Sequence, residues 1–178
     1  AIWNKVFTVT WKDADGEILE VDENVLEDST PSYDREEPSK AETEDYIYTF
    51  TGWTPELSPV KSDIIYTAVY SVLEKNVKIT HADGSVTYYE TVNDAVNGST
   101  AGETIVLLKN RTENVSIPNG KKVTIDLNGK NISASSGIAI TNSGTLSIVG
   151  NGVVSATSYG SAIDNQGVIE KIAGGTFK

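Results

Sequence analysis

Alternating apolar and polar residues along the first 72 positions predict short β-strands separated by polar turns. Four segments are rich in β-branched and aromatic residues, at 6–11, 18–21, 46–53 and 64–70. Asp15-Gly16 separates the first two segments, and this pair is typical of a tight hairpin turn. In the third segment the alternation places Tyr46, Tyr48 and Phe50 on one face, which we expect to be the core face.

An acidic stretch at 28–45 interrupts these strands. It contains Pro31 and Pro38, so it can hold at most a short helical turn near 39–44. We therefore expect a loop here and a small mixed sheet around it. Residues 73–76 carry little pattern and are expected to link this sheet to the second part of the chain.

The second part of the chain begins with another hairpin signal and one helix. Segments 77–80 and 85–89 flank Asp83-Gly84. Thr91 is a suitable N-cap for a short helix over 91–97, in which apolar residues recur at spacings of three and four and Gly98 comes next. This is the one helix that the pattern predicts.

From here the chain repeats itself. Residues 137–146 match residues 160–169 at an offset of 23, with five identical positions. Short β runs joined by Asn and Gly turns at this period predict a parallel β-helix, in which equivalent residues stack about 4.8 Å apart. Extending the offset backwards predicts two interior ladders and one asparagine ladder: Ile117, Ile140 and Ile163; Val123, Leu146 and Ile169; and Asn119, Asn142 and Asn165.

The asparagine ladder is expected to be structural. Amide side chains can hydrogen-bond to their copies in the next coil, and asparagine tolerates tight turns. Contact with a carbohydrate is the alternative. Tyr159, on a coil of small residues, could likewise stack on a sugar ring or pack against the next loop.

Both parts resemble families of bacterial surface proteins. The order of motifs through 7–70, above all Phe50-Thr51-Gly52-Trp53, is similar to the internalin B-repeat (Listeria-Bacteroides repeat) group. That resemblance implies a β-grasp-like spacer without catalytic residues. The stretch 123–132 and Gly174-Gly175-Thr176-Phe177 resemble the pectin-lyase-like β-helices of bacterial adhesins, and the helix resembles their cap.

The expected fold is therefore mainly β, in two domains. Residues 1–72 are predicted to form the β-grasp-like module. Residues 73–178 are predicted to form a truncated right-handed parallel β-helix of about three to four coils, with a short N-terminal capping helix. Since the chain lacks methionine and stops inside a coil of the repeat frame, we expect it to continue in a longer protein.

Composition narrows the function. Cysteine is absent, which excludes disulfides and thiolate chemistry. The net charge of −11 lies in residues 1–72, with 16 Asp/Glu against 5 Lys/Arg, whereas residues 73–178 hold 9 of each. Nucleic-acid binding is disfavoured because there is no basic stripe. No apolar run is long enough for membrane insertion.

Candidate chemistry is sparse, and no catalytic, cofactor-binding or metal site is predicted. The acids of residues 115–178 are Asp126, Asp164 and Glu170, which do not stack in the repeat frame. His81 is the single histidine and is expected to be an exposed loop residue without catalytic partners. Residues 13–17 partly match a calcium loop but are better explained as a turn, and weak calcium binding by the acidic run remains open.

These features favour a non-catalytic protein of the extracellular bacterial surface, of Gram-positive type and monomeric. It would act in adhesion or as a spacer and present its β-helix to a host protein or glycan. The alternative is that it forms the scaffold of a β-helix polysaccharide lyase or hydrolase whose active site lies outside this chain.

Overall fold

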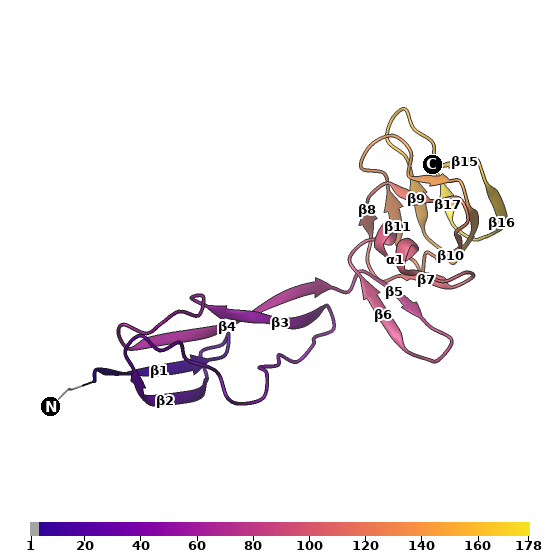
Figure 1. Ribbon diagram of the computed structural model, residues 1–178. Helices are drawn as coiled ribbons and strands as arrows, with labels where there is room; N and C mark the ends of the chain where they lie inside the picture. The colour runs from indigo at the N-terminus through magenta and orange to yellow at the C-terminus, as the bar shows by residue number, and fades with distance from the viewer. Residues whose placement is uncertain (1–3) are drawn as a thin grey trace. The chain divides into compact units, whose positions relative to one another are not determined.

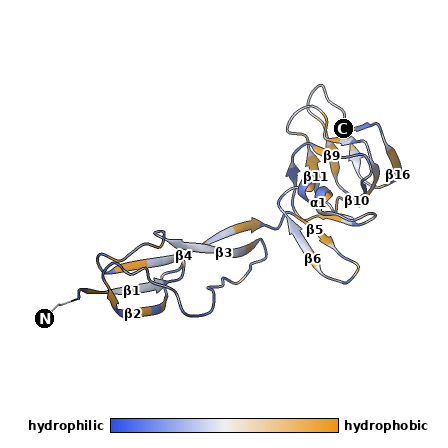
Figure 2. Ribbon diagram, in the orientation of Figure 1, coloured by the Kyte–Doolittle hydropathy of each residue, from blue (hydrophilic) through white to orange (hydrophobic). Residues whose placement is uncertain are grey.

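The computed structural model describes residues 4–178, and these form mostly β-strands with a single short helix (Figure 1). The chain divides between Val72 and Leu73 into two compact units, which are described separately. Figure 2 shows hydrophobic stretches in strands of both units and mostly hydrophilic loops between them. Within the described range no helix is long and apolar enough to cross a membrane.

The first unit is a four-stranded mixed sheet with the order β2-β1-β4-β3. β1 and β2 are antiparallel and β1 and β4 are parallel, so the sheet is mixed, as predicted. The hairpin at Asp15-Gly16 is confirmed, since the Asp13 carboxylate accepts hydrogen bonds from the N–H groups of Asp15 and Glu17. The strands are β1 (Val6–Lys12), β2 (Ile18–Leu26), β3 (Tyr46–Thr54) and β4 (Ile64–Glu74).

The core of this unit lies under β1 and β4. Trp11 and Tyr66 are fully buried and stack with ring centroids 4.9 Å apart. The expectation that Tyr46, Tyr48 and Phe50 form the core face is wrong, because Tyr46 is 38% exposed and the other two are only half-buried. The physical reason is that β3 is an edge strand, so the central pair of strands defines the core. Residues 28–45 form a loop without a helix.

The second unit is a β-solenoid of three sheets in which the coil strands run parallel, which confirms the predicted parallel β-helix. The first sheet has the order β16-β13-β10-β7-β5-β6, the second β17-β14-β11-β8 and the third β15-β12-β9. Each coil contributes one strand to each sheet. The coil strands are β7 (Thr104–Leu107), β8 (Arg111–Thr112), β9 (Val115–Ile117), β10 (Lys122–Asp126), β11 (Asn131–Ser133), β12 (Ile140–Asn142), β13 (Thr145–Val149), β14 (Val153–Ser155), β15 (Ile163–Asn165), β16 (Val168–Ala173) and β17 (Thr176–Phe177).

The 23-residue register holds between the later coils in the third sheet and, up to a bulge in β16, in the first sheet, whereas β11 and β14 of the second sheet pair at an offset of 22. Ile140 pairs with Ile163, Val123 with Leu146, and Leu146 with Ile169. Except in the last coil, where Ile163 and Ile169 are partly exposed, these side chains are buried in one continuous core. The interior ladders are thus confirmed for these coils.

The register of the first coil differs from the prediction in the third sheet. Ile140 pairs with Val115 and Asn142 with Ile117, so the offset there is 25. The turn between β9 and β10 spans 118–121, whereas the equivalent later turns span only 143–144 and 166–167. A shift of two residues preserves the side of the strand that faces inward, and Ile117 is accordingly fully buried.

The start of the solenoid is covered by a hairpin and the helix. β5 (Val77–Thr80) and β6 (Val86–Tyr89) are antiparallel, and β5 pairs antiparallel with β7. Helix α1 (Val92–Gly98) begins at the predicted N-cap, where the Thr91 hydroxyl accepts a hydrogen bond from Asp94 N–H. Val92, Ala95 and Val96 of the helix are buried in the solenoid core. The helix therefore caps the first coil, as predicted.

Candidate binding groove on the solenoid turns

Three stacked turns form a shallow groove on the side of the solenoid, with a volume of about 430 Å³. These are the turns that lead from the third sheet into the first sheet in successive coils. At the parallel-strand spacing, three coils span about 10 Å along the solenoid axis. The groove is lined by Asn119, Gly120, Lys121, Lys122, Ser143, Gly144, Thr145, Gln166, Gly167 and Val168.

Glycines form the floor of this groove. A Cβ atom on Gly144 would lie 2.5 Å from the carbonyl oxygens of both Lys121 and Pro118. A Cβ atom on Gly167 would lie 2.2 Å from the Gly144 oxygen. Only glycine lets these turns stack so closely.

The walls of the groove are polar and contain no carboxylate. Asn119, Ser143 and Gln166 come from the turns, and Lys122, Thr145 and Val168, which are paired in register, are the first residues of β10, β13 and β16. Amide and hydroxyl groups both donate and accept hydrogen bonds. The groove is therefore suited to a ligand rich in hydroxyl or amide groups.

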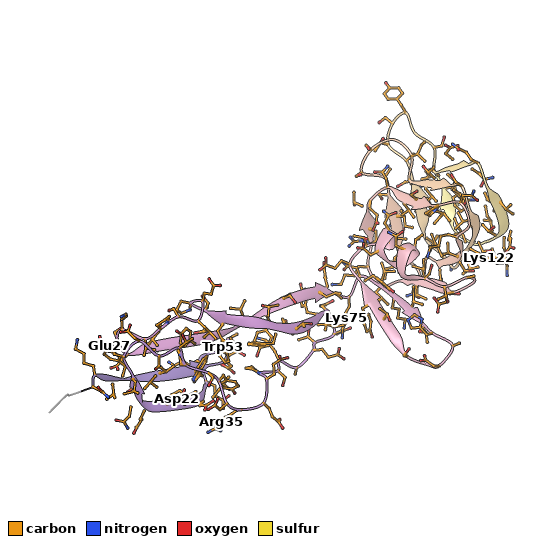
Figure 3. The ribbon with its side chains drawn as sticks, viewed as in Figure 1. Asp22, Glu27, Arg35, Trp53, Lys75 and Lys122 are labelled. Atoms are coloured by element: carbon orange, nitrogen blue, oxygen red, sulfur yellow. The ribbon has the colours of Figure 1, made fainter. Side chains whose placement is uncertain are left out.

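The two lysines of the groove already have partners. Lys121 Nζ donates hydrogen bonds of 2.8 Å to the carbonyl oxygens of Asn97 and Ser99, so it ties the first turn to the end of α1. Lys122 is labelled in Figure 3. Its Nζ lies 2.7 Å from a carboxylate oxygen of Glu170, on the outside of the first sheet. Both side chains of this second pair are about half exposed, so the pair contributes little stability.

The asparagine ladder is confirmed for two of its three members. The buried Asn142 donates a 2.6 Å hydrogen bond to Asn165 and a 3.0 Å hydrogen bond to the carbonyl oxygen of Val168. Its own oxygen accepts from Gly144 N–H. Asn119 does not join the ladder, because the longer first turn places it on the groove wall. The ladder holds the floor of the groove in position from behind.

The acids considered for catalysis lie apart. Asp126 pairs with Val149 and Asp164 with Thr141, so they do not stack, as predicted. Glu170 is the extra residue of a bulge in β16, which moves Val149 opposite Ala173 rather than Ile172. Among residues 4–178 there is no group of three or more His, Cys, Asp or Glu side chains that could hold a metal ion.

Sequence reasoning missed two polar networks near the start of the solenoid. The Glu113 carboxylate accepts hydrogen bonds from Val92 N–H and Arg111 Nε, and it thereby caps the N-terminus of α1. The expectation that His81 is exposed and has no partners is wrong: its Nδ1 lies 2.7 Å from Glu103 and its Nε2 lies 2.8 Å from the Thr87 hydroxyl. The partners come from strand pairing, which the spacing in sequence does not reveal.

The hydrogen-bonded series of Thr87, His81 and Glu103 has the order of groups found in nucleophilic triads, but its geometry favours a structural role. Thr87 is exposed on the edge strand β6, and its hydroxyl is a hindered secondary alcohol. The second Glu103 oxygen accepts from Thr100 N–H at 2.7 Å. These hydrogen bonds thus connect the β5–β6 hairpin to the turn that precedes β7.

This network should make stability depend on pH. The Thr100 N–H bond and then the His81 contact hold the pKa of Glu103 below its ordinary value of 4.5. A lowered folded-state pKa contributes stability above the unfolded-state pKa, and this contribution is lost as pH falls through the folded-state pKa. Glu103→Gln should therefore flatten the acid side of the curve of unfolding free energy against pH by a fraction of one proton. Urea titrations between pH 3 and 7, followed by far-UV circular dichroism, measure this slope.

His81→Leu is the matched variant for this experiment. It removes the His81 contact, which lowers the pKa of Glu103 less than the Thr100 hydrogen bond does, and it keeps that hydrogen bond. Its slope should therefore lie between those of the unmodified protein and Glu103→Gln. An unchanged slope in Glu103→Gln would contradict the assignment.

Comparison with protein-family models, curated proteins and solved structures finds no match to this chain.

Proposed function

We propose that this chain is a non-catalytic adhesion protein of the extracellular bacterial surface, and that its solenoid binds a host glycan along the groove. The observation that carries the proposal is the groove itself, a polar hollow repeated over three coils with glycines as its floor. A repeating ligand suits a repeating surface, because each coil can offer the same kind of contact to the next sugar unit.

The groove is preorganised for binding. Its floor is fixed by the close stacking at Gly144 and Gly167, and the Asn142 hydrogen bonds hold the backbone behind it. A rigid site orders fewer groups when a ligand binds, which improves affinity. The lining offers Asn119, Ser143 and Gln166 as donors and acceptors but no Asp or Glu for turnover.

The family resemblances support the same assignment. A β-grasp-like sheet followed by a parallel β-helix is the arrangement expected of an internalin-type repeat joined to a pectin-lyase-like adhesin, and those resemblances favour a Gram-positive cell surface as its location. In this proposal the first unit is a spacer and the second unit presents the binding face. The polysaccharide-enzyme scaffold is the competing proposal.

Binding to an array of immobilised host glycans tests the function. The full chain should bind one or more oligosaccharides weakly, and the double variant Asn119→Ala, Gln166→Ala should bind roughly tenfold less because both groove-wall amides are lost. Thr112→Ala, on an exposed position of the second sheet, is the control and should bind like the unmodified protein. No binding to the array, or glycan binding that the groove variants leave unchanged, would contradict the assignment.

The enzyme proposal is tested with polygalacturonate, with and without calcium. We expect no lyase or hydrolase products from the full chain. Turnover that disappears in Asp126→Asn or Asp164→Asn would move the protein to the polysaccharide-active class.

A further inference from the structure

The first unit contains an aromatic depression that a spacer does not need. Its volume is about 370 Å³, within the lower range of ligand pockets. The loop between β2 and β3, the strand β3 and the loop after it contribute the lining. The residues are Pro31, Ser32, Tyr33, Arg35, Glu37, Pro38, Phe50, Trp53 and Leu57.

The core of the unit holds the aromatic wall of this depression in place. Trp53 contacts the fully buried Trp11 with ring centroids 4.7 Å apart. It also contacts Tyr33 at 4.9 Å and Phe50 at 5.4 Å (Trp53 is labelled in Figure 3). The rings are half-buried, so part of their surface remains open to solvent. Leu57, at 42% exposed, extends the apolar wall outward.

The loop that forms one side of the depression is acidic, although its Glu27 and Asp28 are paired with Lys5 and Lys61. The loop 27–45, which forms one side, holds eight Asp/Glu against two Lys/Arg. Glu37 lines the depression, and Glu20 lies close enough to Tyr33 to raise the pKa of its hydroxyl, after the larger effect of burial. Neither Arg35 nor Glu37 forms an ion pair with another residue of the range 4–178. An anionic polymer would be repelled, and a cationic ligand attracted.

We propose that this depression binds an extended, basic, proline-containing segment of a partner protein. Proline-rich segments adopt the polyproline II conformation, in which the backbone carbonyls stay free to accept hydrogen bonds. Such segments dock into grooves lined by aromatic rings. Here Tyr33, Phe50 and Trp53 receive the proline rings, Arg35 donates to a peptide carbonyl, and Glu37 pairs with the basic side chain.

This site goes beyond the proposed function, because it assigns the first unit a partner of its own. It uses no residue of the solenoid groove. Loss of glycan binding and loss of peptide binding are therefore separable in one protein.

Fluorescence anisotropy of labelled dodecapeptides added to the full chain tests the proposal. A peptide of repeated Pro-Pro-Lys triplets should bind at least about tenfold more tightly than one of Pro-Pro-Glu or Gly-Gly-Lys triplets, because it alone satisfies both the rings and the acids. Equal binding of Pro-Pro-Lys and Gly-Gly-Lys would overturn the proposal, since charge alone would explain it. Displacement of the peptide by neutral maltohexaose would also overturn it, because the rings would then be a sugar platform.

Two pairs of matched variants locate the site. Leu57→Ser removes an exposed apolar contact and Glu37→Lys reverses a charge in the lining, and each should weaken Pro-Pro-Lys binding roughly tenfold. Leu26→Ser, at 50% exposed, and Glu44→Lys, in the same acidic loop, lie outside the lining and should change binding less than about twofold. These four surface changes avoid the fully buried Trp11 and Tyr66, and circular dichroism verifies that each variant folds. Equal weakening by Glu37→Lys and Glu44→Lys would reject the site.

Discussion

Replacing Ile140 by Asp should unfold the solenoid or reduce its free energy of unfolding by about 4 to 5 kcal/mol. Ile140 is fully buried, and its pairing with Val115 and Ile163 places it in the middle coil. The variant loses the burial of an isoleucine side chain and introduces a carboxyl group without a partner. Both effects lower the free energy of unfolding.

Ser143→Asp is the control for this experiment. Ser143 lies three residues further along the chain, at the half-exposed turn, so the same new carboxyl group remains hydrated there. We expect it to cost less than about 1 kcal/mol. Equal losses in the two variants would show that the register assigned to the middle coil is wrong.

Tryptophan fluorescence distinguishes the unfolding of the first unit from that of the second. All three lie in the first 72 residues, at positions 3, 11 and 53. Tryptophan fluorescence during urea denaturation therefore reports on the first unit, while far-UV circular dichroism reports on both. Ile140→Asp should change the circular dichroism transition and leave the fluorescence transition unchanged. A parallel loss in both signals would mean that the units unfold together.

Replacing Gly144 by Ala should cost about 3 kcal/mol, although it adds only one methyl group. The new Cβ would lie 2.5 Å from the backbone oxygens of Lys121 and Pro118, and backbone atoms cannot turn aside as the end of a side chain can. The steric clash can be relieved only if the two turns move apart. That movement would stretch the 2.8 Å hydrogen bond from Thr145 N–H to the Lys121 oxygen.

Gly120→Ala is the matched control in the same groove. Gly120 has a φ of 82° and no atom within 4 Å of an added Cβ. Its substitution should cost roughly 1 kcal/mol from the left-handed backbone alone. Thermal denaturation followed by circular dichroism gives both values. A smaller loss at Gly144 than at Gly120 would show that close stacking does not require glycine at this turn.

Local patterns in the sequence determined most of the secondary structure. The pairs Asp15-Gly16 and Asp83-Gly84 predicted two hairpins, and Thr91 predicted the start of the helix, because turn and cap preferences act within a few residues. The repeat of 23 predicted the solenoid and the pairing of Ile140 with Ile163, since stacked coils require equivalent residues.

The residues that meet across those elements depend on how the strands are arranged in the sheets. The alternation in β3 assigned Tyr46, Tyr48 and Phe50 to one face, but the position of the strand at the sheet edge, which no local pattern specifies, left them outside the core. The contacts of His81 with Glu103 and Thr87 likewise depend on the pairing of β5 with β6 and β7.

At the groove, the repeat predicted one asparagine contact correctly and one incorrectly. The repeat predicted that Asn142 and Asn165 stack, but it placed Asn119 beneath them by assuming turns of equal length. The first turn is two residues longer, so Asn119 reaches the groove wall while Ile117 takes its place in the ladder. Strand alternation has a period of two, so this change kept the core intact and altered only the surface, where the proposed ligand would bind.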